Sequence, residues 1–306
     1  MIIDSHAHIY HPNEAQYPMK VEPFRPAAGV GTIEHLRRET AANGVDRVVL
    51  VQTGSAYRWD NRLLADTAKA NDNWTVGVCT LDPASADAPD ELERLVADFN
   101  VKGVRVEVAP AGYDQPGSQA LWRRAGEIGA VICAHLQRDY LSELAALLER
   151  YPAVPVVLDH CAYPVGADGI EDRAIREAAV LARYPQLYAK VTFAVTSSQR
   201  EYPFTDTHAQ LRHILAAFGP DRCMWGSDFP CEHWLKKSTY AQHMAVFANE
   251  LGLHAEERDQ VLGQTAERVF SLTNCAIFSS MLRSSGRSSA LQAISYALSK
   301  TSVPIF

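Results

Sequence analysis

Apolar and polar positions alternate in blocks along most of the chain. Short apolar runs recur, and segments with apolar residues at helical spacing separate them. We interpret the apolar runs as buried strands, at residues 2–8, 46–52, 74–79, 102–108, 130–135, 156–160, 187–191 and 223–228. The segments predicted to be helical are residues 32–43, 61–71, 90–99, 118–128, 141–151, 170–184, 208–218, 240–251 and 255–270.

Strands that are apolar throughout, each followed by an amphipathic helix, indicate a parallel sheet covered on both faces. Eight such units close most economically into a single (β/α)8 TIM barrel of the α/β class, and a doubly wound open sheet is the alternative. The barrel domain is expected to span residues 1–273. Residues 274–306 are Ser-rich, and we interpret them as an appended C-terminal extension, disordered or partly helical over 290–298.

Composition narrows the class of protein further. The chain has 306 residues, of which 47% are hydrophobic and 21% charged, as in ordinary globular enzymes. Its net charge is −7, and no cluster of Lys and Arg is present that could follow a phosphate backbone, so nucleic acid is not an expected partner.

The N-terminal sequence, the lack of long apolar runs and the cysteine spacing favour a cytoplasmic location. The first residues lead straight into a strand, and no run of about 18 apolar residues follows anywhere, so neither a secretory leader nor a membrane span is expected. The six cysteines are scattered without C-x-x-C spacing, which favours reduced, buried thiols over disulfides or a zinc knuckle.

Candidate chemistry gathers at the predicted strand ends, where barrel enzymes carry their active sites. His6 and His8 are two residues apart on one strand, so both rings point to the same side. Further polar side chains end the other strands, and such groups are costly to bury unless they are paired or bind something. They are Gln52, Arg105, Glu107, His135, Asp159, His160, Lys190 and Asp228.

Each candidate also has a purely structural interpretation. His160 could be a satisfied core histidine, His135 could bond a neighbouring backbone group, and Asp228 could cap a short helix. Arg105 could clamp a substrate carboxylate with two hydrogen bonds, or form a salt bridge to Glu107 or Asp159. Three residues in loops beyond the strand ends are candidates for substrate binding or for the rim: Asn61, Arg138 and Tyr163.

Four segments together resemble the amidohydrolase superfamily, in particular its amidohydrolase-related (family 2) group with pyrone and sugar lactonases. They are residues 4–8 (DSHAH), 102–105 (KGVR), 158–160 (LDH) and 225–230 (WGSDFP), and the likeness extends over residues 1–272. The resemblance implies a TIM barrel whose reaction centre is His6, His8, His160 and Asp228. It assigns Asp228 as the general base for a hydrolytic water and Arg105 as the group that holds an anionic substrate.

Two departures from the family pattern qualify this resemblance. Arg105 follows Val104 where metal-rich relatives carry a carbamylated lysine, so a binuclear centre is not expected. The protein would therefore use no cofactor or one divalent ion, with zinc preferred, held by residues from the set His6, His8, His135, His160 and Asp228. Tyr163 stands where the pyrone lactonases carry an arginine, which argues against a dicarboxylate substrate.

The predicted function is hydrolysis of a lactone or similar carbonyl in a small carboxylated metabolite. Gln52, Asn61, Arg138, Tyr163 and Lys190 join Arg105 as candidate substrate contacts. The alternatives are a mononuclear zinc decarboxylase or lactone isomerase on the same scaffold, and a barrel that binds a small acid without catalysis. Whether the protein forms a homo-oligomer is left open.

Overall fold

The structure is a computed structural model that describes residues 1–230 and 238–272. Eight parallel strands form one sheet in the order in which they occur along the chain. The strands are β1 (Ile3–Ala7), β2 (Arg47–Val51), β3 (Thr75–Thr80), β4 (Val101–Glu107), β5 (Val131–His135), β6 (Val156–Leu158), β7 (Leu187–Lys190) and β8 (Cys223–Met224). All eight predicted strands are therefore present.

Hydrogen bonds between β1 and the segment after β8 close the sheet into a barrel. The Ser5 amide donates to the Trp225 carbonyl at 3.2 Å, and the Asp228 amide donates to the His6 carbonyl at 2.8 Å. The His8 amide then donates to the Phe229 carbonyl at 2.8 Å. Since both edge strands are paired in this way, the predicted TIM barrel is confirmed and the open doubly wound sheet is excluded.

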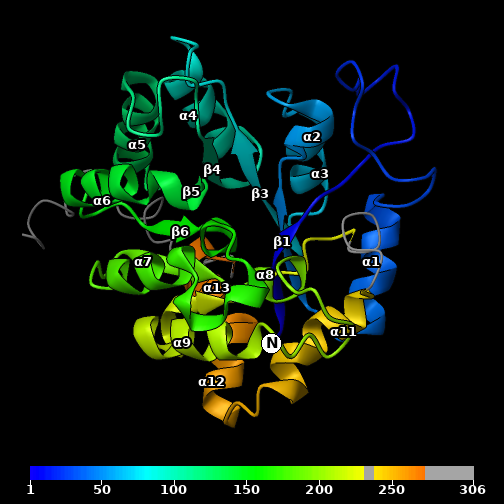
Figure 1. Ribbon diagram of the computed structural model, residues 1–306. Coiled ribbons are helices and arrows are strands. Elements are labelled where there is room, and N and C mark those ends of the chain that lie inside the picture. The colour runs from blue at the N-terminus through cyan, green and yellow to red at the C-terminus, as the bar shows by residue number, and fades with distance from the viewer. Residues whose placement is uncertain (231–237, 273–306) are drawn as a thin grey trace, which may run out of the picture. The chain divides into compact units, whose positions relative to one another are not determined.

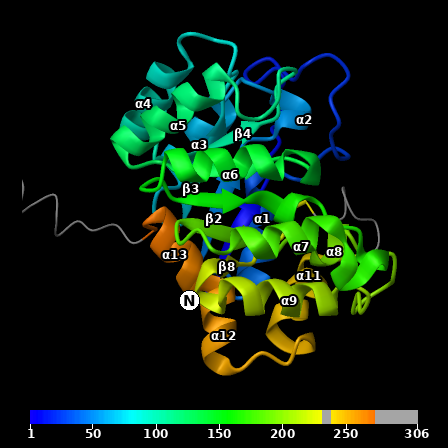
Figure 2. The same ribbon diagram turned by 60° about the vertical axis from the view of Figure 1, so that its left-hand side comes forward.

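Helices surround the barrel, as Figure 1 shows from one direction, and in Figure 2 helices α6, α7 and α9 lie one below another along its outside. The main helices are α1 (Ile33–Ala42), α3 (Arg62–Ala70), α4 (Ala88–Asp98), α5 (Pro116–Ile128), α6 (Leu141–Arg150), α7 (Arg173–Leu181), α9 (His208–Phe218), α11 (Tyr240–Ala245), α12 (Ala255–Asp259) and α13 (Thr265–Phe270). Local sequence sets several ends: Pro116 begins α5, and Gly129 ends it in the left-handed conformation with φ of 71°.

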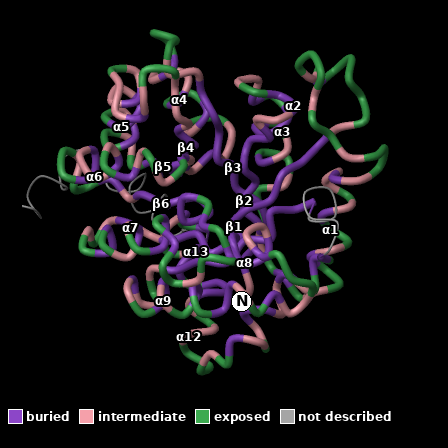
Figure 3. The backbone as a smooth tube through the Cα atoms, viewed as in Figure 1, coloured by how far each residue is buried: buried purple, intermediate pink, exposed green. Residues whose placement is uncertain are grey.

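The apolar core has two parts, which follow from the alternation of side chains along each strand. Val48 and Leu50 of β2 pack in the cluster that joins strands to the surrounding helices. Val49 and Val51 of the same strand belong to a second cluster, made of inward side chains from several strands and closed at one end by α13. Figure 3 accordingly shows buried strands and exposed outer helices and loops.

The structure differs from the predicted elements mainly at the ends of strands. β6 ends at Leu158 and β8 at Met224, so His160 and Asp228 lie in turns just beyond their strands instead of inside them. Both residues have positive φ, 54° and 55°, a conformation that a strand cannot contain. Two segments between the predicted elements also contain one-turn helices, α2 (Gly54–Tyr57) and α8 (Phe193–Thr196).

The predicted helices at 170–184, 240–251 and 255–270 are each divided. Short 3₁₀ turns within Gly166–Glu171, separated by a kink at Gly169, precede α7. The helix starts after Asp172, whose side chain accepts a hydrogen bond from the Ile175 amide. The wider turns Val246–Glu250 and Gln260–Gln264 interrupt the other two.

The compact unit that contains the barrel spans Met1–Leu272. The predicted extension 274–306 and its expected helix lie outside the described residues. In the described part of the chain, no helix is long and apolar enough to cross a bilayer. Cys79, Cys133, Cys161 and Cys223 are buried and free, as predicted for reduced thiols.

Candidate active site

A cavity of about 420 Å³ lies at the carboxyl ends of the strands. Strands β4 and β5 and the segments that follow β1, β2, β6, β7 and β8 line it, so the cavity occupies the place where the sequence predicts the site. The lining residues are His8, Thr53, Gly54, Ser55, Arg105, Glu107, His135, His160, Tyr163, Thr196 and Asp228.

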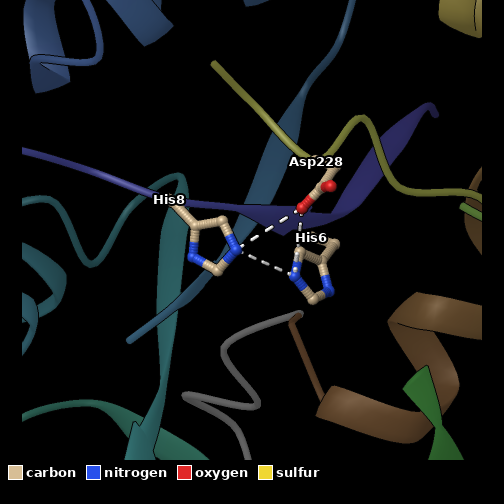
Figure 4. Close-up of side chains that lie close together, drawn as sticks. All are labelled: His6, His8 and Asp228. Carbon is tan, nitrogen blue, oxygen red and sulfur yellow. Dashed lines mark hydrogen bonds and ion pairs between the residues drawn. The ribbon is translucent and has the colours of Figure 1, made fainter. Parts of the chain in front are cut away.

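His6, His8 and Asp228 converge on one point at this end of the barrel (Figure 4). The Nε2 atoms of the two imidazoles are 3.2 Å apart. The Oδ1 atom of Asp228 lies 3.4 Å from Nε2 of His8 and 3.6 Å from Nε2 of His6. Residues separated by more than 200 positions in the chain thus meet within hydrogen-bond reach of one another or of a single bridging water.

Local packing explains why the Asp228 turn comes so close to β1. Gly226 precedes it, and a Cβ atom there would lie 2.6 Å from the Cβ of His6, so only glycine permits this approach. Asp4 also fixes this segment. Its carboxylate accepts hydrogen bonds from the Ser227 amide at 2.8 Å and from the Ser227 hydroxyl at 2.5 Å. The Tyr240 hydroxyl donates to Asp4 as well, at 2.9 Å.

Contacts on the far side of each ring fix the two histidines of β1. Nδ1 of His8 lies 2.9 Å from the Val51 carbonyl, which can only accept, so Nδ1 carries a proton and Nε2 faces His6 and the Asp228 carboxylate. Nδ1 of His6 lies 3.2 Å from Nζ of Lys190 and 3.9 Å from Oδ1 of Asp159. The His6 ring therefore rests on a buried ion pair.

That ion pair is part of a cluster of three buried charges beneath the cavity. Asp159 receives Lys190 Nζ on Oδ1 at 2.9 Å and Arg105 Nε on Oδ2 at 2.9 Å. Lys190 and Asp159 are fully buried, and Arg105 is 5% exposed. Arg105 also lines the cavity, so the salt bridge and the site position that the sequence offered as alternatives are both present.

His160 is held in one tautomer between this cluster and β7. Arg105 Nη2 donates toward Nε2 of His160 at 3.3 Å, and Nδ1 lies 2.5 Å from the hydroxyl of Thr192. Burial, with the nearby charge of Arg105, lowers the pKa of His160 to about 3. The ring is consequently neutral at pH 7.

Asp228 is ionised in this environment. Burial alone would raise the pKa of its carboxyl group, but the contact with His8 and the positive charge of Arg105 outweigh burial and hold the pKa below its usual range. The site thus places an ionised carboxylate beside imidazole rings, an arrangement that can accept a proton from water or bind a cation.

The donor set of the β1 wall, formed by His6, His8 and Asp228, fits a divalent metal ion. One ligand atom from each residue lies within 4.8 Å of the others, and within the described ranges no further His, Cys, Asp or Glu joins this set. Two imidazoles and a carboxylate are a donor set that zinc accepts. The ring nitrogens of His160 are both engaged by other partners, and so are those of His135.

His135 lies on the opposite wall, formed by Glu107, His135 and Tyr163. Its Nδ1 is 3.5 Å from Oε1 of Glu107, and its Nε2 shares a hydrogen bond with the Tyr163 hydroxyl. The Tyr163 ring lies over the His160 ring with centroids 4.8 Å apart. Inclusion of His135 and His160 among metal ligands stays a prediction that this geometry does not favour.

Four predicted substrate contacts are placed outside the cavity lining. Gln52 donates from Nε2 to the carbonyls of Arg58 and Asp60, and Asn61 bonds the backbone of Thr80, so both brace loops. The other two are Arg138, whose Nη1 faces Asp172 at 3.5 Å, and Lys190, which lies behind His6.

The structure gives roles to residues that were not assigned to catalysis or binding. Asp159 joins the two cations, and Asp4 fixes the Asp228 turn. The sequence offered the salt bridge of Asp159 with Arg105 as an alternative, but it did not predict Lys190 as the second partner. Thr53, Ser55 and Thr196 line the cavity from the one-turn helices, which carry no periodic signal because of their length.

Comparison with known proteins agrees with this geometry. Residues 3–272 match the amidohydrolase family, and the chain belongs to it. L-fucono-1,5-lactonase of Burkholderia ambifaria is 27% identical over 245 residues, 78% of this chain and 81% of that protein. 4-Sulfomuconolactone hydrolase of Rhizobium radiobacter is 26% identical over 237 residues, 74% of this chain and 75% of that one. The predicted family and enzyme class are confirmed.

Two solved structures share the fold. A probable 2-pyrone-4,6-dicarboxylic acid hydrolase from Acinetobacter baumannii, with citric acid bound, superposes with a TM-score of 0.75 at 20% identity, over 88% of this chain and 99% of that chain. An amidohydrolase from Burkholderia multivorans, with zinc bound, superposes with a TM-score of 0.73 at 24% identity, over 89% of this chain and 100% of that one.

Proposed function

We propose that the protein hydrolyses the ring ester of a small lactone, with Asp228 as the general base. The observation that carries the proposal is the position of the Asp228 carboxylate, 3.4 Å from His8 and 3.6 Å from His6, at the wall of a cavity that Arg105 also lines. The names of the related lactonase and lactone hydrolase support the same class of substrate.

In this mechanism Asp228 acts on the water and Arg105 acts on the carbonyl group. Asp228 accepts a proton from the water as its oxygen attacks the carbonyl carbon. The guanidinium of Arg105 donates toward the carbonyl oxygen, where negative charge develops. The bond between the carbonyl carbon and the ring oxygen then breaks, and the ring oxygen takes back the proton that Asp228 accepted, which regenerates the carboxylate and gives a hydroxy acid. His160, neutral and hydrogen-bonded to Arg105, keeps that guanidinium in place.

We further propose that His6, His8 and Asp228 hold one divalent ion, and that zinc suits them best. The zinc in the Burkholderia multivorans amidohydrolase and the donor set of the β1 wall support this assignment. When bound, such an ion would polarise the carbonyl group or lower the pKa of a water ligand.

The test is a panel of lactones assayed by proton release, with Asp228→Asn beside the wild type. Hydrolysis liberates a proton at neutral pH and isomerisation does not, so the same readout separates a hydrolase from a lactone isomerase; carbon dioxide release identifies a decarboxylase. We expect kcat to fall about 10³-fold in Asp228→Asn with little change in KM. Asp139→Asn, an exposed carboxylate on the outer surface, is the control.

Two outcomes would overturn the proposal. One is a wild-type protein that is inert toward the whole panel, which would favour a barrel that binds acids without catalysis. The other is full activity of Asp228→Asn, which would remove the proposed base. A cytoplasmic location and a small anionic substrate stay predictions that other experiments must test.

A further inference from the structure

The wall formed by Glu107, His135 and Tyr163 is a hydrogen-bonded chain that the proposed hydrolysis does not use. It runs from a carboxylate through an imidazole to a phenol at the cavity surface. The side chains of His135 and Glu107 are 23% and 30% exposed, and Tyr163 is 36% exposed, so the chain is open to a ligand in the cavity.

The chemistry of the partners sets the direction of this chain. The carboxylate of Glu107 can only accept, so the neighbouring Nδ1 of His135 carries the ring proton. Burial lowers the pKa of His135, which leaves the ring neutral and its Nε2 an acceptor. The Tyr163 hydroxyl must therefore donate to Nε2. Its oxygen keeps its lone pairs for the cavity, where it can accept a hydrogen bond but has no proton left to donate.

An unusual turn places the phenol at this position. His160, Cys161, Ala162 and Tyr163 all have positive φ, between 48° and 62°. A left-handed turn without glycine costs about 1–2 kcal/mol per residue, so tight packing must hold it. The turn sets the Tyr163 ring over His160 and directs its hydroxyl to His135.

We propose that this chain is a subsite for a hydroxyl group of the substrate, so that the lactone is a hydroxylated one. A substrate hydroxyl can donate to the Tyr163 oxygen, and each bond of the chain then points toward the negative charge of Glu107. A carboxylate in the same place would face an acceptor oxygen backed by an anion. The inference rests on the proposed lactone hydrolysis and narrows its substrate class to lactones that carry a hydroxyl group.

The test compares two kinds of six-membered lactone with and without the phenol. The substrates are the best of a set of epimeric polyhydroxy δ-lactones and δ-valerolactone, which has the same ring without hydroxyls. We expect wild-type kcat/KM to favour the hydroxylated lactone at least tenfold. Tyr163→Phe keeps the ring over His160 and should lower kcat/KM about tenfold or more for the hydroxylated lactone, while that for δ-valerolactone changes less than about twofold.

Glu107→Gln should lower the preference for the hydroxylated lactone over δ-valerolactone, because the amide removes the negative charge at the end of the chain. Tyr184→Phe removes an exposed phenol far from the cavity lining and is the control. A purely structural role of Tyr163 would lower kcat/KM equally for both lactones, and that outcome overturns the inference.

Preference for δ-valerolactone or for a dicarboxylated pyrone would overturn the inference and leave lactone hydrolysis intact. A wild-type protein inert toward every lactone would overturn both. The two failures are therefore distinguishable in one set of assays.

Discussion

The two walls of the cavity contain the same residue types, histidine and a carboxylate, but these residues make different contacts in each wall. On the β1 wall, the outward nitrogens of His6 and His8 and the carboxylate of Asp228 converge within 3.6 Å. On the opposite wall, both ring nitrogens of His135 are already engaged, by Glu107 and Tyr163. Imidazoles with converging nitrogens suit proton transfer and metal binding, whereas an imidazole inside a directed chain suits recognition. The chemistry open to a histidine in this cavity therefore depends on the contacts of its ring nitrogens.

The largest expected effect is on stability, and it concerns the charges beneath the β1 wall. Asp159→Asn leaves the buried cations of Lys190 and Arg105 without their shared carboxylate, and we expect the free energy of unfolding to fall by about 3–5 kcal/mol. Urea denaturation measures this loss. Asp139→Asn breaks an exposed pair with Arg173 and should cost less than about 1 kcal/mol. Equal losses of unfolding free energy in Asp159→Asn and Asp139→Asn would show that the buried charge cluster does not stabilise the β1 wall.

Metal affinity should distinguish the two walls directly. His8→Asn removes a proposed ligand, so we expect its zinc affinity to fall about 100-fold or more, whereas His135→Asn should stay within about threefold of the wild type. Isothermal titration of the metal-free proteins with zinc gives both numbers without any assay of activity. A comparable loss of zinc affinity in His135→Asn would place the ion between the two walls. That result would contradict the assignment of metal binding to the β1 wall alone.

A histidine outside both walls shows how burial alone couples stability to pH. His243 is fully buried and accepts a hydrogen bond from Trp225, and burial lowers its pKa to about 4. Because its folded pKa lies below the unfolded value of about 6.5, it contributes stability that is complete above pH 6.5 and is lost as the pH falls toward 4. Between pH 7 and pH 5 this loss amounts to about 2 kcal/mol.

The measurement is urea unfolding of the wild type and His243→Gln at both pH values. The variant should lose about 2 kcal/mol less than the wild type on acidification, whatever its stability at pH 7. An identical pH dependence of the two proteins would mean that His243 does not titrate between the folded and unfolded states in this range.

The sequence predicted the barrel and the β1 wall for physical reasons that are local or that follow from the fold. Strands such as β3 and β4 are apolar runs with a simple pattern, and two histidines two residues apart on a strand must share a side. Once the barrel is inferred, its geometry alone brings Asp228 near His6.

The partners of each polar group could not be predicted in the same way. Nothing in the sequence says that Lys190 contacts His6 from behind, or that Gln52 braces a loop, because these contacts depend on side-chain directions across several strands. The turn that places Tyr163 was equally hidden, since left-handed residues other than glycine have no strong sequence signal. The contacts of a polar side chain were therefore less predictable than its position at a strand end.

The most direct test of the two-wall account is a crystal structure of Asp228→Asn soaked with an unhydrolysed polyhydroxy δ-lactone. We predict the carbonyl carbon within about 3.5 Å of a water bound by the side chain at position 228, and a ring hydroxyl within about 3.2 Å of the Tyr163 oxygen. A lactone turned with its carbonyl toward Glu107, or seated instead in the separate cavity of about 390 Å³ beside Tyr10 and Arg25, would contradict the account.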